Sequence, residues 1–526
     1  MASLKYTPKQ HITEIHSRLS KTFREGRTLP LEYRRKQLLQ VARLVQENAD
    51  DIMASLKADL GRHPFEATLP ELGPMVSSAL HAVENLDKWN SPEKPQVEAW
   101  RSGWDTTIFK APKGTVLSIS PWNFPWVLTI LPLIGAIAAG CTCLIKPSEH
   151  AQASAALIEK LIPQYLDPDA YAVCLGAVEE TTHVLGLKWD HIFYTGSTSV
   201  GRIIAEAAAK QLTPVTLELG GQSPVFVDGD STNIEIAAKR ILWGKQQNAG
   251  QVCVAPNHVF VQEQYQSALV EAFRKAYDSF WPKGPLDSSS EMACVLNARH
   301  YERNKSLLSR TKGKVVIGGQ AGQDLRIEPA IVTGVKLDDP LMEEEIFGPI
   351  LPIIPVANVD AAISHIQSGS TPLVIYVFTE NEETKNKFVQ RTQSGQLILN
   401  ETFAQVAVYE IPFGGQGQSG YGSYLGKYSF DTFTHQRGYI NVPADARTEG
   451  FMQGRYPPYS APALEFFSQA LKAKIPDAQS LVLSRVMRRG KYTKPSELQP
   501  YNVQSVVGLS TQYSPLSVVP NIVIAA

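Results

Sequence analysis

One cysteine of the chain stands in a context that could carry covalent chemistry. Cys253 follows the stretch Asn248-Ala249-Gly250-Gln251-Val252, in a chain of 526 residues with five cysteines. A thiolate is a strong nucleophile where its surroundings favour ionisation, whereas most free cysteines are small, buried and inert. Position alone favours the inert cysteine, so other residues have to decide between the two interpretations.

Two acidic positions could supply a proton acceptor. Glu218 lies between two leucines, the second of which precedes two glycines, while Glu343–Glu345 precede Ile346, Phe347 and a Gly-Pro turn. Burial raises the pKa of a carboxyl group and suits it to act as a general base. The alternatives are an ordinary strand or helix end for Glu218 and a solvated surface for the three glutamates.

Strands that alternate with helices must position these residues. Between residues 114 and 214 the sequence predicts strands at 115–120, 142–145, 171–175 and 191–195, and helices at 128–139, 151–166 and 200–211. A second series, between 216 and 399, predicts strands at 224–227, 257–261, 329–332, 350–354 and 374–378, and helices at 234–244 and 264–280. Residues 1–90 have apolar residues at helical spacing. The pattern predicts an α/β fold with two Rossmann-like domains, each built on a parallel sheet.

Polar residues follow three strands of the first series, in the stretches Ser120–Asn123, Lys146–Glu149 and Gly196–Gly201. Parallel sheets bind ligands outside the carboxyl ends of their strands. The last stretch joins a strand, a glycine-rich turn and a helix start, which offers backbone N–H groups to a phosphate. It has GxxxxG spacing, but Arg202 replaces the lysine of a P-loop, and the GxGxxG signature is absent there. A glycine that only permits the turn is the alternative. Three polar strand ends together favour a nucleotide-binding crevice.

Composition limits the class of protein and its partners. The hydrophobic content of 43% and charged content of 19% are those of a soluble globular protein, and the net charge of −1 gives no reason to expect a nucleic acid partner. The five cysteines lack disulfide-framework spacing, which favours a reducing, cytoplasmic location. Residues 127–145 carry no charge, but Pro132, Gly135 and Gly140 interrupt them. We therefore expect a buried helix followed by a buried strand rather than a membrane span.

Several motifs together resemble one family. They are Pro121-Trp-Asn-Phe-Pro125, Lys146-Pro-Ser-Glu149, Gly196-Ser-Thr198, Leu217-Glu-Leu-Gly-Gly221, Gly250-Gln-Val-Cys253, Glu344-Glu-Ile-Phe-Gly-Pro349 and Pro412-Phe-Gly-Gly415 with Ser419-Gly420. In this order and spacing they resemble the NAD(P)-dependent aldehyde dehydrogenase superfamily. Residues 426–435 and 455–458 are similar to the class 3 and fatty aldehyde dehydrogenase branch, which includes fungal enzymes that oxidise long apocarotenals.

The resemblance implies a role for each motif. Cys253 would be the nucleophile, Glu218 the base that activates water, and the Asn123 side-chain amide an oxyanion donor together with the backbone N–H of Cys253. The implied cofactor is NAD, with NADP as an alternative, and no metal is implied. The implied cofactor-binding residues are Trp122, Lys146, Glu149, Gly196, Ser197, Gly201, Glu345 and Phe347.

The resemblance also implies a domain organisation. Residues 1–91 and 112–215 would bind NAD(P), and 216–414 would form the catalytic domain. Residues 92–111 and 415–442 would form a small β arm that bridges the subunits of a homodimer. Residues 443–526 extend beyond the family pattern. Their basic residues beside apolar ones, among them Arg485, Arg488 and Arg489, could rest on a membrane surface or pack on the protein itself.

The substrate implied by the branch is a long apolar aldehyde, either a fatty aldehyde or an apocarotenal. The alternatives are a broad-specificity dehydrogenase of aromatic or medium-chain aldehydes and, from another class, a non-enzymatic protein on the same scaffold. Gln222, Asn257 and Gln416 depart from the residues common in the family, which leaves the details of substrate selection open.

Overall fold

The computed structural model describes residues 4–290, 292–472 and 475. The chain forms two compact units. The first combines Met1–Ser91 with Phe109–Arg437, and the second combines Pro92–Ile108 with Gly438–Ala526. All the predicted site residues belong to the first unit.

A six-stranded sheet forms one half of the first unit, in the order β14-β6-β5-β2-β3-β4. Its strands run parallel except β14, which is antiparallel to β6. They are β2 (Thr115–Ile119), β3 (Thr142–Lys146), β4 (Tyr171–Val173), β5 (His191–Thr195), β6 (Val215–Glu218) and β14 (Gly420–Tyr421). Every residue of β2, β3 and β5 is buried, as expected for parallel strands covered on both faces.

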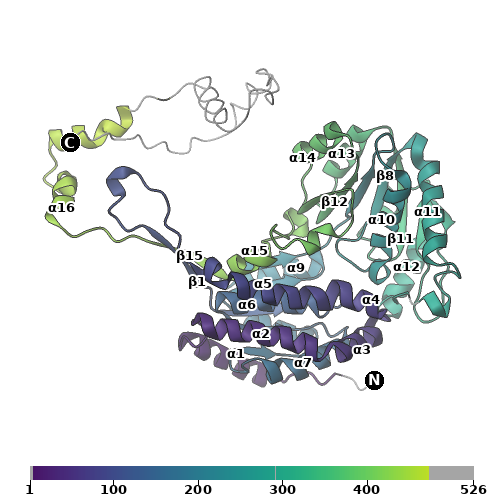
Figure 1. The fold of residues 1–526 in the computed structure, drawn as a ribbon, viewed down its shortest axis with the longest axis horizontal. Coiled ribbons are helices and arrows are strands. Elements are labelled where there is room, and N and C mark those ends of the chain that lie inside the picture. Colours follow the sequence, from purple (N-terminus) through teal and green to yellow (C-terminus); the bar gives the residue numbers. More distant parts are fainter. Residues whose placement is uncertain (1–3, 291, 473–474, 476–526) are drawn as a thin grey trace. The chain divides into compact units, whose positions relative to one another are not determined.

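Helices cover both faces of this sheet. On the face that carries Val116 and Phe193 pack α2 (Leu31–Glu47), α5 (Gly73–Asn90), α6 (Val127–Ala139) and α7 (Gln152–Tyr165). On the face that carries Leu117 and Ile192 pack α1 (Lys9–Arg24), α8 (Val178–Gly186) and α9 (Thr198–Ala209). The two faces alternate along each strand because side chains of a strand repeat every two residues. In Figure 1 the purple helices α2 and α3 (Ala49–Leu60) lie beside α7.

A seven-stranded sheet forms the other half, in the order β13-β12-β7-β8-β11-β10-β9. Only β9 is antiparallel to its neighbour. The strands are β7 (Pro224–Val227), β8 (His258–Gln262), β9 (Lys314–Ile317), β10 (Ala330–Thr333), β11 (Ile350–Val356), β12 (Val374–Phe378) and β13 (Gln396–Leu399). Figure 1 shows the helices beside this sheet: α10 (Ile234–Gln246), α11 (Gln266–Phe280), α12 (Ala298–Arg310), α13 (Val359–Ser368) and α14 (Glu382–Arg391).

The predicted α/β class with parallel sheets is confirmed, and each predicted strand and helix lies within two residues of its expected bounds. Strands β6, β9, β13 and β14 and helix α8 were not predicted, and neither were the three helices α12, α13 and α14 of the second series. Helices α12 and α14 bury only two residues each, so few apolar residues mark them in the sequence. All three begin after an asparagine, at Asn297, Asn358 and Asn381, whose side chain accepts a backbone N–H of the first turn. These N-caps are the signal that could have located them.

The uncharged stretch at 127–145 is the buried helix α6 followed by the buried strand β3, as predicted. Gly140 ends the helix in the left-handed conformation, with φ of 90°. Within residues 4–290, 292–472 and 475, no helix is both long and apolar enough to cross a membrane.

The second unit contains short elements. A 3₁₀ turn (Ala99–Arg101), α16 (Ala446–Met452) and α17 (Ala461–Phe467) belong to it, and the ring of Trp100 lies 5.2 Å from Trp104 and 6.1 Å from Phe451. The strands β1 (Thr107–Pro112) and β15 (Thr434–Tyr439) pair in a two-stranded sheet. The role of this region as a bridging arm stays a prediction. The basic stretch at Arg485–Arg489 lies outside the described residues.

Candidate active site

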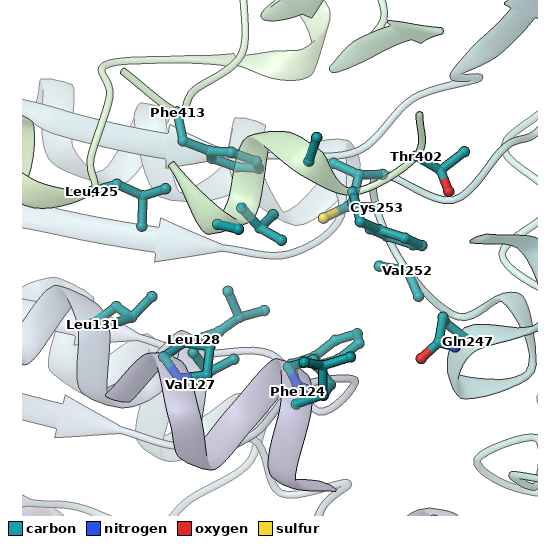
Figure 2. A pocket seen from close by; sticks show the side chains of 18 of the residues that line it. Phe124, Val127, Leu128, Leu131, Gln247, Val252, Cys253, Thr402, Phe413 and Leu425 are labelled. Carbon is teal, nitrogen blue, oxygen red and sulfur yellow. The ribbon is translucent and has the colours of Figure 1, made fainter. Parts of the chain in front are cut away.

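A cavity of about 950 Å³ lies beside Cys253 in the first unit. Cys253 and Glu218 both line it, and in Figure 2 the Cys253 sulfur points into the space that Phe124 and Leu128 face from the opposite wall. Most of the remaining wall is apolar, formed by Val127, Leu131, Trp243, Phe280, Phe403, Phe413, Tyr424 and Leu425. The cysteine therefore opens onto a large apolar chamber, which is unlike the environment of an inert core cysteine.

Three consecutive left-handed residues lead to the cysteine. Asn248, Ala249 and Gly250 have φ of 48°, 52° and 74°. A Cβ on Gly250 would lie 2.2 Å from the carbonyl oxygen of Gly348, so only glycine fits there. Left-handed alanine costs free energy, and such strain persists only where surrounding contacts over-determine it. The sharp turn brings the Cys253 side chain to the cavity.

Asn123 lies in the loop between β2 and α6 and is 4% exposed. Its Nδ2 donates a hydrogen bond of 3.0 Å to the carbonyl oxygen of Gln251, two residues before Cys253. Because a carbonyl oxygen only accepts, this contact assigns the nitrogen of the amide and leaves it a second N–H. The structure thus brings Asn123 to the loop of the cysteine.

Glu218 is the last residue of β6 and is 2% exposed. Neither of its carboxyl oxygens has a hydrogen-bond partner in the described part of the chain. Burial raises the pKa of this carboxyl group well above its ordinary value. Burial without a hydrogen-bond partner favours the protonated form of this carboxyl group.

Two hydroxyl residues that the motifs did not assign lie at the same ends of the strands as Glu218. Thr195 is paired with Glu218 in the register of β5 and β6, and Ser120 follows the last residue of β2, the strand on the other side of β5. The hydroxyl oxygens of both are buried without a hydrogen-bond partner among the described residues. Their place at the carboxyl ends of adjacent strands was the sequence signal that could have grouped them with Glu218.

The Cys253 thiol is held in its protonated form. Burial, and then the carboxyl groups of Glu345 and Glu218, raise the pKa of Cys253 to about 12. Burial also raises the pKa of Glu345 to about 8. At neutral pH the thiol therefore has to lose its proton before it can attack a substrate.

Most of the predicted cofactor residues lie at the carboxyl ends of the strands of the first sheet. At the end of β3, Lys146 Nζ lies 3.0 Å from Glu149 Oε2. Burial acts to raise the pKa of Glu149, but the Lys146 ammonium outweighs it and holds the pKa below its ordinary value. Glu149 therefore carries its negative charge across the neutral range.

The glycine-rich turn has two different kinds of glycine. Gly196 ends β5 and leads to Ser197, whose Oγ caps α9 by accepting the N–H of Val200 at 3.4 Å. Gly201 is buried in α9, and a Cβ there would lie 2.8 Å from the Leu219 side chain. Gly201 thus permits α9 to approach the end of β6 closely, a packing role that differs from both the predicted phosphate binding and the turn-permitting alternative.

The loop of Glu345 and Phe347 reaches the same edge. The ring of Phe347 meets Trp122 edge to face at 5.5 Å, and a Cβ on Gly220 would lie 2.3 Å from Glu345 Oε2. The side chain of Asn257 accepts the N–H of Ile346 at 2.9 Å and so fixes this loop.

These residues fit a dinucleotide. The carboxyl ends of the strands offer a buried ammonium beside a partly exposed carboxylate, and the N-terminus of α9, where Val200 and Ile203 are apolar yet 40% and 59% exposed. Such a set suits a ribose, a phosphate and an apolar ring face.

The family is decided by comparison with known proteins. The model of the family described as "Aldehyde dehydrogenase family" matches residues 1–438. The chain belongs to the aldehyde dehydrogenase family.

The matches between this aldehyde dehydrogenase and its relatives cover most of both chains. It is 42% identical over 444 residues to aldehyde dehydrogenase family 3 member A2 of Pongo abelii, covering 84% of this chain and 90% of the relative. It is 40% identical over 462 residues to the beta-apo-4'-carotenal oxygenase of Neurospora crassa, covering 87% and 86%. It is 39% identical over 452 residues to a Mus musculus protein named "aldehyde dehydrogenase, dimeric NADP-preferring", covering 86% and 98%.

A solved structure has the same fold. The substrate-bound state of Staphylococcus aureus AldH is 36% identical, with a TM-score of 0.84, and the match covers 87% of this chain and 99% of that one. The predicted resemblance to the class 3 branch is confirmed, and the aldehyde dehydrogenase is an oxidoreductase of a family that uses NAD(P). The roles of individual residues stay predictions.

Proposed function

We propose that the protein oxidises long apolar aldehydes to carboxylic acids with NAD(P)⁺, through a covalent intermediate on Cys253. One observation carries the proposal: Cys253 and Glu218 face the same large apolar cavity. The volume, about 950 Å³, is at the upper end of the range of small-molecule sites, about 300–1,000 Å³. A chamber of this size and polarity suits a long hydrocarbon chain better than a small polar aldehyde.

Cys253 begins the reaction. Its thiolate adds to the aldehyde carbon and forms a thiohemiacetal, and the thiol proton passes to a buried carboxylate, Glu218 or Glu345, whose raised pKa suits it to accept the proton. The addition converts a trigonal carbon into a tetrahedral one that can release hydride.

The oxyanion that forms needs hydrogen-bond donors. The second N–H of the Asn123 amide and the backbone N–H of Cys253 are the proposed pair, and Asn123 is already anchored to the cysteine loop at Gln251. Loss of one such donor typically costs about 3–4 kcal/mol in the transition state.

When bound, the nicotinamide cofactor accepts the hydride. Collapse of the oxyanion then leaves a thioester on Cys253. Glu218, as carboxylate, takes a proton from water, which attacks the thioester, releases the acid and regenerates the cysteine. The hydroxyl group of Thr195, which is buried opposite Glu218 without a hydrogen-bond partner among the described residues, would hold that water.

The cofactor would lie along the sheet edge. Lys146 and Glu149 would hold the adenosine ribose, and Gly196 and Ser197 the pyrophosphate, with Gly201 packing α9 behind them. Trp122, Glu345 and Phe347 would border the nicotinamide half. The negative charge of Glu149 repels a 2′-phosphate, which favours NAD over NADP.

The finer substrate class rests on the cavity and on one relative. The Neurospora crassa protein that is 40% identical is named for an apocarotenal. A fatty aldehyde or an apocarotenal is therefore the proposed substrate of this chain, and a dehydrogenase of aromatic or medium-chain aldehydes is the second candidate. A homodimer is proposed because the Mus musculus relative is named dimeric. We further propose a cytoplasmic location and membrane contact through the tail.

A single assay tests the proposal. Reduction of NAD⁺ and NADP⁺ is followed by absorbance with straight-chain aldehydes of increasing length, an aromatic aldehyde and an apocarotenal. We expect kcat/KM to rise with chain length and to exceed the value for the aromatic aldehyde. A maximum at short or aromatic aldehydes would favour the second candidate, and no turnover with any of them would refute the dehydrogenase.

A further inference from the structure

A buried arginine joins the two loops that carry the reacting groups. Arg62 is 1% exposed, and its guanidinium donates to the carbonyl oxygen of Asn123 and, at 3.0 Å, to the side-chain oxygen of Asn248. The same group lies 4.1 Å over the ring of Phe124. The third partner of the guanidinium is Glu71, which belongs to the N-terminal helical region. The three nitrogens of Arg62 thus contact three separate segments of the chain.

Glu71 extends the contact to the start of α6. Its Oε1 accepts from Arg62 at 2.5 Å, and its Oε2 accepts the backbone N–H groups of Trp126 and Val127 at 3.0 and 2.8 Å. Both members of the ion pair are completely buried. A buried charge without its partner is costly, so the pair holds the two segments at fixed distances.

Asn248 completes the link on the cysteine side. Its Nδ2 donates to the carbonyl oxygens of Asn123, at 2.9 Å, and of Gln251, at 3.2 Å. Gln251 returns a hydrogen bond of 3.0 Å from Nε2 to the carbonyl oxygen of Asn248. These contacts supply what the left-handed turn at Asn248 and Ala249 requires, since strained backbone needs such bonds to persist.

We infer that Arg62 is a positioning residue for the oxidation: through the carbonyl of Asn123 and the side chain of Asn248, it sets the distance between the Asn123 amide and Cys253. The inference rests on the proposed function and deepens it. Arg62 lines no part of the cavity described above and touches no reacting atom. It acts on the oxyanion donor and on the turn before the nucleophile.

Lysine cannot replace this arginine. An ammonium group keeps the positive charge beside Glu71 but lacks the planar fork that reaches Asn123, Asn248 and Glu71 together. Arg62→Lys should therefore loosen the register of the two loops without leaving Glu71 unpaired. A displacement of about 1 Å at a catalytic group can lower the rate on the order of 100-fold.

Arg34 provides a matched control. It is also a buried arginine of the first unit, 4% exposed, and it donates to the carbonyl oxygens of Thr28, Leu29 and Ala138. It holds the opposite end of α6 and contacts neither Asn123 nor Asn248 in the described structure. Arg34→Lys reproduces the general effect of replacing a buried arginine, without the proposed change in the distance between the Asn123 amide and Cys253.

The experiment uses the full-length enzyme and two rates. The first is kcat/KM for the best aldehyde with cofactor, which needs the oxyanion donor. The second is the alkylation rate of Cys253 by iodoacetamide, read by mass spectrometry of its peptide, which forms no oxyanion. We expect Arg62→Lys to lower kcat/KM about 10- to 100-fold, to leave alkylation within about 2-fold, and to add no further loss to Asn123→Ala. Arg34→Lys should keep both rates near those of the wild type.

Each other outcome is decisive. Equal kcat/KM in Arg62→Lys and Arg34→Lys, a parallel fall of both rates in Arg62→Lys, or additive losses with Asn123→Ala would overturn the inference. If Arg62→Lys does not fold, Asn248→Gly is judged by the same criteria, since glycine adopts the left-handed φ and introduces no charge. An inactive wild type would refute the proposed function instead.

Discussion

Thr195 and Glu218 stand opposite each other in the register of β5 and β6, and neither side chain has a hydrogen-bond partner in the described structure. Adjacent strands lie about 4.8 Å apart, so the hydroxyl group of Thr195 is a close polar neighbour of the Glu218 carboxyl group. The carboxyl group of Glu218 therefore has a polar neighbour on one side and the apolar cavity on the other. Its protonation should control both turnover and stability.

Glu218→Gln should separate acylation from hydrolysis. The amide cannot accept a proton from water, so steady-state turnover should fall about 10²- to 10⁴-fold. The first hydride transfer should remain, and stopped-flow absorbance should show a burst near one reduced cofactor per active site. A variant without a burst would place Glu218 in the first step as well. In the wild type, the deacylation rate should rise with pH through the raised pKa of Glu218.

The same carboxyl group predicts how stability depends on pH. The pKa of Glu218 is raised in the folded state, so the unfolded chain loses this proton at a lower pH than the folded protein does. The folded state therefore loses stability as the pH rises above the pKa that Glu218 has in the unfolded chain. Glu218→Gln has no such proton. Its melting temperature should match the wild type near pH 4 and exceed it increasingly toward pH 8. Thermal unfolding at a series of pH values measures the difference, and a constant offset would contradict the buried, proton-holding carboxyl.

Glu345→Gln should make Cys253 more reactive, but only at alkaline pH. The Glu345 carboxyl raises the pKa of the thiol and itself has a pKa of about 8, so its negative charge appears above that pH. In the cofactor-free enzyme, alkylation of Cys253 by iodoacetamide should be faster in the variant above pH 8 and unchanged at pH 6.5. Cys294, a second partly exposed cysteine, serves as the internal reference.

A bulky residue in the cavity wall should shorten the accepted substrate. Leu131 faces the cavity one helical turn from Leu128, so Leu131→Trp fills space that a long chain would occupy. We expect kcat/KM to fall at least 10-fold for the longest aldehydes and to stay within about 2-fold for short ones. Leu80→Trp, on an exposed part of α5 outside the cavity wall, is the control. Equal losses for all chain lengths would show that the cavity does not select by length.

Glu149→Gln should shift the cofactor preference toward NADP. The variant lacks the negative charge of the Glu149 carboxylate, which Lys146 helps to keep ionised. The repulsion between this charge and a 2′-phosphate is then absent. The ratio of kcat/KM for NADP⁺ to that for NAD⁺ should rise about 10-fold, equivalent to about 1.4 kcal/mol. An unchanged ratio would separate Glu149 from the ribose.

The sequence did not predict β6, β9, β13 and β14. It predicted the other strands of the two sheets, the helices that bury a continuous apolar stripe and the motifs around Cys253, Glu218 and Asn123. These features are local, and each lies within a few neighbouring residues. The contact of Arg62 with Asn248 joins positions 186 residues apart, and no periodicity or spacing reports such a pair. The packing of Gly201 against Leu219 was likewise invisible, since a glycine in a turn looks the same whether it faces a ligand or a neighbouring side chain.

Helix α6 contributes to two regions, the wall of the cavity and the core beside the first sheet. Val127, Leu128 and Leu131 of α6 face the cavity, while Ile130 and Ile137 are completely buried in the core. Truncating the core-facing residues should cost about 2–5 kcal/mol each, a large part of the stability of a typical domain. Substitutions that change the substrate range can therefore arise with little loss of stability at only a few positions of this helix. Substitutions at the core-facing positions would first require stabilising changes elsewhere.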